Sequence, residues 1–190
     1  MVLLCLEGEL GSGKTLGLTY LAALNYNKGR TIYSNYELRF PYTYVDTIEM
    51  ISEMENCFAA LDEFWLWADS RASHSKKNKI ISTVLLQSRH IDCDIGFTAQ
   101  SFHQIDRRIR HVTDFIIRPM LNKSETKCTL FWYSKASAKP AKIMRFSTGN
   151  VFPLYKSTGR DSIISQLKDD PDKKKQDKNL KRSVKLQDHS

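Results

Sequence analysis

Residues 2–15 read VLLCLEGELGSGKT, a short apolar run followed by a glycine-rich loop. The apolar run predicts a buried strand over residues 2–7. The residues after the loop predict a helix over residues 14–27, which ends near Gly29. The loop matches the spacing G-x-x-x-x-G-K-[ST] in full and lies between a strand and a helix, as phosphate-binding loops of this type require. The segment therefore predicts an α/β fold built around a phosphate-binding loop.

This loop offers the groups that a nucleoside triphosphate and Mg²⁺ require. Glycines allow backbone N–H groups to surround a phosphate, and the start of the following helix adds a favourable dipole. The ammonium of Lys14 is expected to reach the β- and γ-phosphates, and the hydroxyl of Thr15 is expected to ligate Mg²⁺. We therefore predict ATP and Mg²⁺ as ligands. The predicted nucleotide-binding residues are Gly8, Gly11, Ser12, Gly13, Lys14 and Thr15.

A second motif, Phe58-Ala59-Ala60-Leu61-Asp62-Glu63, places two acids directly after a short apolar strand over residues 57–61. We expect Asp62 to hold Mg²⁺, directly or through water, and Glu63 to polarise the attacking water. An acidic turn after a strand is common in any protein. Its combination with the phosphate-binding loop nevertheless favours hydrolysis of ATP over phosphate transfer to a small substrate.

Two further residues are candidates for contact with the terminal phosphate. Gln100 ends the apolar run of residues 95–99, where its amide can contact the γ-phosphate or the attacking water, although polar residues leave strands in most proteins. Arg89 closes a predicted helix over residues 79–90. The helix dipole alone accounts for a cation there. The alternative is an arginine that reaches a nucleotide held by a neighbouring subunit, and the spacing leaves both interpretations open.

The charge balance indicates a polyanionic partner. The chain has 29 lysine and arginine residues against 21 aspartate and glutamate residues, which gives a formal net charge of +8. Fixed positive charge attracts the phosphate backbone of nucleic acids, although many basic proteins bind none. No apolar run approaches the roughly 20 residues that span a bilayer, so we expect no transmembrane segment. The candidate DNA contacts are Lys76, Lys77, Arg107, Arg108 and Arg110.

Cysteine spacing excludes a zinc site of the usual kind. Cys5, Cys57, Cys93 and Cys128 are scattered, without a pair at the short spacing that metal sites use. Three of the four lie in apolar, strand-like stretches. We therefore expect buried free thiols and no disulfide framework, which suits a reducing cytosol.

Strand and helix patterns alternate over the first 118 residues, which predicts a parallel sheet covered on both faces. Residues 112–118 predict a further strand, and residues 126–133 and 142–147 predict an antiparallel hairpin. From Gln166 onward the composition becomes polar and charged, with few apolar residues. We therefore predict an ATPase domain over residues 1–165 and a disordered tail over residues 166–190.

The order of these motifs resembles the zonula occludens toxin-like ATPases of the FtsK/HerA superfamily, over about residues 1–120. The resemblance implies a RecA-like P-loop NTPase fold of the additional-strand, catalytic-glutamate type, with a central, mostly parallel sheet flanked by helices and a C-terminal β-hairpin. It also implies that Gln100 contacts the terminal phosphate and that Arg89 acts in trans. The motifs are the glycine loop, Ala60-Leu61-Asp62-Glu63, Ser88-Arg89-His90, Thr98-Ala99-Gln100 and Ile105-Asp106-Arg107-Arg108-Ile109-Arg110.

The same resemblance implies an ATP-driven translocase of double-stranded DNA that packages a viral genome into a preformed capsid. Such a motor is a homo-oligomer, with a hexameric ring expected, and works in the host cytoplasm or docked on a virion vertex. Capsid or inner-membrane proteins of the virion are then further partners. Filamentous-phage assembly ATPases usually carry a membrane span after the ATPase domain, and none is found here, which favours packaging.

Three alternatives stay open. The first is an assembly or secretion ATPase of the filamentous-phage type, which acts on coat protein during virion extrusion. The second is a small-molecule kinase, against which stand the Asp62-Glu63 pair and the lack of an obvious lid. The third is a nucleotide-gated binding module that binds ATP without turnover.

Overall fold

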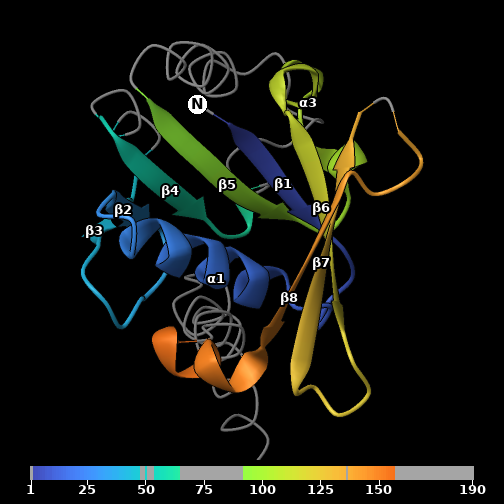
Figure 1. Cartoon of the computed structure of the whole chain (residues 1–190). Helices are drawn as coiled ribbons and strands as arrows, with labels where there is room; N and C mark the ends of the chain where they lie inside the picture. Colours follow the sequence, from blue (N-terminus) through green and yellow to red (C-terminus); the bar gives the residue numbers. More distant parts are fainter. Residues whose placement is uncertain (1, 48–49, 51–53, 65–91, 136, 157–190) are drawn as a thin grey trace, which may run out of the picture. The chain divides into compact units, whose positions relative to one another are not determined.

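β1 (Leu3–Glu7), the strand that leads into the glycine loop, lies inside an eight-stranded sheet with the order β3-β2-β4-β5-β1-β6-β7-β8 (Figure 1). The computed structural model describes residues 2–156, except 48–49, 51–53, 65–91 and 136. The other strands are β2 (Thr31–Ser34), β3 (Thr43–Tyr44), β4 (Cys57–Leu61), β5 (Cys93–Ala99), β6 (Phe115–Leu121), β7 (Lys127–Ser134) and β8 (Lys142–Ser147). The helices are α1 (Lys14–Tyr26) and α3 (Arg107–Val112), and the 3₁₀ turns are η5 (Phe102–Gln104), η6 (Thr148–Asn150) and η7 (Phe152–Leu154).

The strands from β3 to β6 in this order run parallel. β1 pairs in parallel with β5 and β6, β4 pairs in parallel with β2 and β5, and β2 pairs in parallel with β3. β5 therefore lies between the glycine-loop strand and the acidic strand, which is the additional strand that the predicted fold type requires. The register pairs Glu7 with Ala99 and Leu61 with Phe97. The carboxyl ends of β1, β4 and β5 consequently meet at one edge of the sheet.

Alternating side chains of the central strands form two cores, one on each face of the sheet. Leu3 and Cys5 of β1 belong to the first core, to which Ile109 of α3 also contributes. Leu4 and Leu6 belong to the second core, and α1 packs against that face. Each fully buried leucine contributes about 1.5–3 kcal/mol to the free energy of folding. These two apolar faces confirm the prediction of a sheet covered on both sides.

The C-terminal strands form an antiparallel extension of the sheet. β7 pairs antiparallel with both β6 and β8, and β8 has the predicted bounds. The prediction of a strand starting at Val112 was wrong by three residues. Asp106 caps α3 by accepting from the N–H of Arg108, and the helix continues through Val112 because the Thr113 N–H also donates to a carbonyl of α3.

Several predictions lie outside the described residues: the helix over residues 79–90, the tail over residues 166–190 and the domain boundary near residue 165. They stay predictions. Within the described part of the chain, no helix is long and apolar enough to cross a membrane.

The expectation that every cysteine is a free thiol was wrong for one pair. Cys57 of β4 and Cys93 of β5 form a disulfide, with their Cα atoms 4.7 Å apart. The parallel register places these two residues directly opposite each other although 36 positions separate them in the sequence. Spacing along the chain does not reveal such a register. Cys5 and Cys128 are free and buried, as expected.

Gly96, in the middle of β5, provides a test of the second core. A Cβ atom at this position would lie 2.7 Å from Cδ1 of Leu18 and 3.0 Å from Cζ of Phe58, both of which are buried. We expect Gly96→Ala to lower the free energy of unfolding by about 1–3 kcal/mol because the core is overpacked. Chemical denaturation measures this change.

Gly149→Ala is the matched control, because its new Cβ would find its nearest neighbour at 3.9 Å, an ordinary contact. Equal stability of Gly96→Ala and Gly149→Ala would contradict the described packing of β5 against α1.

Candidate nucleotide-binding site

The glycine loop turns sharply into α1. Gly11 and Gly13 have φ angles of 79° and 93°, a left-handed conformation that side chains with a Cβ rarely adopt. Gly13 is the N-cap of α1, and no side chain caps this helix end. The hydroxyl of Ser12 is buried and has no hydrogen-bond partner among the described residues. These features leave backbone N–H groups and one hydroxyl available for an anionic ligand.

Lys14 lies over the same loop. Its ammonium donates to the carbonyl of Gly8 at 2.9 Å and to that of Glu9 at 2.8 Å. Partial burial lowers the pKa of Lys14, whereas the negative charges of Asp62 and Glu63 act in the opposite direction. A bound phosphate would favour the charged ammonium further. Lys14 is therefore held where the sequence predicts a contact with phosphate.

Asp62 is the most firmly held side chain of the site. Its Oδ2 accepts from the Thr15 hydroxyl at 2.9 Å, and its Oδ1 accepts from the Thr98 hydroxyl at 2.6 Å. The side-chain amide of Asn35 makes two hydrogen bonds to the backbone of Asp62. Its Nδ2 donates to the Asp62 carbonyl at 2.8 Å, and its Oδ1 accepts from the Asp62 N–H at 2.7 Å. The Thr15 and Asp62 oxygens thus converge, and oxygen ligands of this kind suit Mg²⁺.

Glu63 is presented to solvent beside this carboxylate. Its backbone N–H donates to the Thr98 hydroxyl at 2.7 Å, and its φ of 49° is a left-handed conformation, which is uncommon for glutamate. Partial burial raises the pKa of Glu63, the charge of Asp62 raises it further, and Lys14 acts against both. A raised pKa brings a carboxylate closer to the working range of a general base.

Gln100 lies beside the glycine loop. It lines a cavity of about 460 Å³ together with Gly8, Glu9 and Ser12. Glu7, Ser101, Arg118 and Pro119 complete the lining. The structure therefore brings the predicted terminal-phosphate residue to the predicted phosphate-binding loop.

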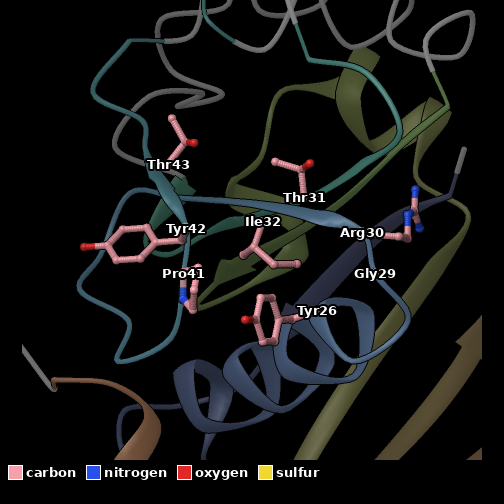
Figure 2. A pocket seen from close by; sticks show the side chains of 8 residues that line it. All are labelled: Tyr26, Gly29, Arg30, Thr31, Ile32, Pro41, Tyr42 and Thr43. Atoms are coloured by element: carbon pink, nitrogen blue, oxygen red, sulfur yellow. The ribbon is translucent and has the colours of Figure 1, made fainter.

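A second cavity, of about 380 Å³, lies at the opposite end of α1 (Figure 2). Figure 2 shows Tyr26, Tyr42 and Ile32 around it. Arg30 lines it as well, but its guanidinium pairs with Asp94 and donates to a backbone carbonyl. Neither a glycine loop nor a helix start faces this cavity. The carboxyl edge of the sheet is thus the better candidate for a phosphate ligand.

The other predicted site residues lie elsewhere. Arg107, Arg108 and Arg110 lie on α3. Two residues after this helix, Asp114 forms hydrogen bonds with Leu3 at the amino end of β1, so the three arginines are distant from the glycine loop (Figure 1). The roles predicted for Arg89, Lys76 and Lys77 fall outside the described residues.

Sequence reasoning missed four residues of the site: Asn35, Thr98, Glu7 and Arg118. Thr98 stood in the motif that identified Gln100, and a hydroxyl one residue before the strand end was the available signal. Asn35 follows β2, which pairs with the acidic strand, but a single asparagine after a strand has no distinctive pattern. Glu7 and Arg118 meet across β1 and β6, which only the sheet order shows.

Comparison with solved structures identifies the fold. The N-terminal domain of zonular occludens toxin from Neisseria meningitidis matches with a TM-score of 0.60 and 22% identity, over 82% of this chain and 100% of that chain. The genome packaging NTPase B204 from Sulfolobus turreted icosahedral virus 2, in complex with ATP-gammaS, matches with a TM-score of 0.55 and 12% identity, over 77% and 96%. The chain has the fold of the P-loop ATPases. The RadB recombinase matches as well, with a TM-score of 0.52 and 13% identity, over 77% of this chain and 86% of that chain.

These matches confirm the predicted RecA-like α/β fold and, at the level of the fold, the resemblance to zonula occludens toxin-like ATPases. Among curated proteins, the uncharacterized protein ORF2 of Spiroplasma virus SpV1-R8A2 B is 30% identical over 123 residues. ORF2 of Spiroplasma virus SpV1-C74 matches to the same extent. The match covers 60% of this chain and 36% of either relative, so it spans about a third of those proteins. No protein-family model matches the chain.

Thr98→Val tests how Asp62 is held. The variant keeps the shape of the side chain but removes the hydroxyl that donates to Asp62 and accepts from Glu63. We expect the free energy of unfolding to fall by about 1–3 kcal/mol, because the part-buried N–H of Glu63 and the Asp62 carboxylate each lose a partner. We also expect Mg²⁺-dependent affinity for ATP to fall roughly tenfold, because the ligand carboxylate loses a supporting hydrogen bond. Calorimetric titration with ATP and Mg²⁺ measures the second effect.

Thr113→Val is the matched control. It removes a buried hydroxyl that donates to the Ile109 carbonyl at 2.8 Å, at the end of α3. It should lose stability in the same way and keep nucleotide affinity. Unchanged affinity in Thr98→Val would show that Thr98 does not support the site.

Proposed function

We propose that this chain is an ATPase and the motor unit that moves double-stranded DNA during packaging of a viral genome into a preformed capsid. The observation that carries the ATPase part is the convergence of Thr15, Asp62 and Glu63 beside the glycine loop. A binding module that only holds nucleotide does not need an acid placed to activate water. A kinase would in addition need a site for the substrate that accepts the phosphate.

Each residue has a defined part in the proposed hydrolysis. The loop N–H groups and Lys14 bind the phosphates, and Gln100 orients the terminal phosphate or the attacking water. Glu63 accepts the proton of that water, for which it must be ionised. Thr15 and Asp62 would hold Mg²⁺, which supplies charge neutralisation of the phosphates when bound.

Support for DNA as the cargo comes from charge and from one structural relative. B204, which shares the fold, is a genome packaging NTPase. Arg107 and Arg108 are exposed on α3, and Lys135 of the hairpin donates to the carbonyl of His111 at the end of the same helix. A cluster of this kind can bind phosphates without reading sequence, which suits a motor that must grip any genome.

The proposed assembly is a homo-oligomeric ring, with six subunits expected. Arg89 would then reach the nucleotide of the neighbouring subunit, which would place hydrolysis at subunit interfaces. The ring would work in the host cytoplasm or on a virion vertex, where capsid or inner-membrane proteins are its partners.

A second candidate keeps the ATPase and changes the cargo. The zonular occludens toxin domain shares the fold over its whole length. The resemblance of the motifs to that group, which includes filamentous-phage assembly ATPases, favours work on coat protein during virion extrusion. The two candidates differ in whether DNA binds and stimulates turnover.

Measurement of ATPase activity with and without double-stranded DNA tests the proposal. We expect DNA to stimulate turnover. We expect Lys14→Ala to lower turnover by about 100-fold or more, and Glu63→Gln by a similar factor while ATP still binds. Turnover without DNA stimulation, and without any salt-sensitive DNA binding, would favour the coat-protein candidate. Wild-type activity in Lys14→Ala would contradict ATP hydrolysis at this loop.

The salt dependence of DNA binding tests the α3 surface. We expect Arg107→Ala/Arg108→Ala to reduce the slope of log affinity against log salt by about 1 for each lost phosphate contact. Lys28→Ala/Lys156→Ala removes two charges from other exposed positions and should leave the slope unchanged. An equal slope in both double variants would exclude α3 as the DNA-binding surface.

A further inference from the structure

Arg118 of β6 faces the same cavity as the glycine loop and Gln100. Its Nε donates to Oε1 of Glu7 at 2.8 Å, and its NH2 lies 2.7 Å from the same oxygen. Glu7 is the last residue of β1 and directly precedes Gly8 of the loop. The pair thus places a guanidinium immediately beside the phosphate-binding loop of its own chain.

The Arg118 guanidinium is held in a fixed orientation, but its contacts do not use all of its N–H donors. Glu7 holds one edge of it, and the ring of Tyr133 lies beneath it, with 5.1 Å between the Arg118 Cζ and the ring centroid. An arginine carries five N–H donors, and within the described part of the chain Glu7 is the hydrogen-bond acceptor that Arg118 contacts. The Arg118 side chain is 59% exposed. Donors therefore remain available on the cavity side.

The Glu7 carboxylate is also held by a hydrogen bond from a third segment of the chain. Its Oε2 accepts from the Phe102 N–H at 3.0 Å, and Phe102 lies two residues after Gln100. Its side chain is only 14% exposed. One carboxylate therefore joins the end of β1, the segment that carries Gln100, and β6. A carboxylate bound in this way can position an arginine with little loss of side-chain entropy on ligand binding.

The charge of the cavity lining favours a role for Arg118 in binding an anionic ligand. Glu7 and Glu9 both line the cavity, and Arg118 is the cation of the lining. A nucleoside triphosphate that entered beside two carboxylates would be repelled unless a cation offset them. Arginine also bonds phosphate through two parallel N–H groups, which gives a directed contact.

We propose that Arg118 binds the terminal phosphate of ATP in its own subunit, with Glu7 as its positioning residue. The assignment to the terminal phosphate follows from Gln100, which lines the same cavity from the other side of β1. This inference rests on the proposed function, since it concerns the same nucleotide. It adds a cation in cis to the arginine expected in trans.

Nucleotide binding to the full chain tests this role. The probes are ATPγS and ADP, each with Mg²⁺, measured by calorimetric titration. We expect Arg118→Ala to weaken ATPγS binding about tenfold or more, because a charge-assisted hydrogen bond is lost. ADP binding should change less than about twofold, because ADP lacks the terminal phosphate. Arg118→Lys keeps the charge without the two parallel donors and should lie between wild type and Arg118→Ala.

The double variant Glu7→Gln/Arg118→Ala distinguishes a direct contact between Arg118 and phosphate from mere neutralisation of the Glu7 charge. It should bind ATPγS as weakly as Arg118→Ala. Recovery of wild-type affinity would overturn the proposal, because Arg118 would then serve only to offset the charge of Glu7.

Arg145→Ala is the matched control, since it removes an exposed arginine from β8, outside the lining of the cavity. It should bind both nucleotides like wild type. Wild-type ATPγS affinity in Arg118→Ala would overturn the role proposed for Arg118 and would leave the proposed function unaffected. Failure of the wild-type chain to bind either nucleotide would instead overturn the proposed function.

Discussion

The carboxylate of Asp62, held between the hydroxyls of Thr15 and Thr98, is the interaction on which the candidate site depends. These three side chains come from three neighbouring parts of the fold: the end of β4, the start of α1 and the end of β5. Their hydrogen bonds bring the oxygen ligands expected for Mg²⁺ to the phosphate-binding loop. A shift of β5 by one residue would turn Thr98 to the opposite face of the sheet and would break this arrangement.

The parallel sheet makes this convergence possible. Carboxyl ends of parallel strands meet at one edge, and in open α/β sheets ligands bind there. The two apolar cores fix the register, because a slip by one residue would move every side chain of a strand from one core into the other, where it would not fit. Among the described residues, left-handed backbone conformations lie at this edge and in the turns and bends between elements, as Glu63 and Gly13 illustrate. The cost of such conformations is of the order of 1–3 kcal/mol for a residue like Glu63, which packing elsewhere must offset.

Local motifs were sufficient to predict the glycine loop and the acidic pair at the end of a strand, because each depends on a few consecutive residues. The fold class followed from the alternation of strand and helix patterns over the first 118 residues and from the order of the motifs. Gln100 was predictable as the tip of an apolar strand. Thr98 and Asn35 were not singled out, because their roles depend on which strands are neighbours. The Cys57–Cys93 disulfide and the Glu7–Arg118 ion pair were not predicted for the same reason. The start of β6 was misplaced because a helix cap at Asp106 competes with strand propensity over the following residues.

Binding of Mn²⁺, a paramagnetic substitute for Mg²⁺, tests the central claim most directly. The claim is that Thr15 and Asp62 together form the metal site of a nucleotide complex. Electron paramagnetic resonance of the wild-type chain with ATPγS should show about one bound Mn²⁺ per chain, with much weaker binding when the nucleotide is left out. Asp62→Asn should lose most of that bound signal. Equal Mn²⁺ affinity of Asp62→Asn and wild type in the presence of ATPγS would contradict the claim.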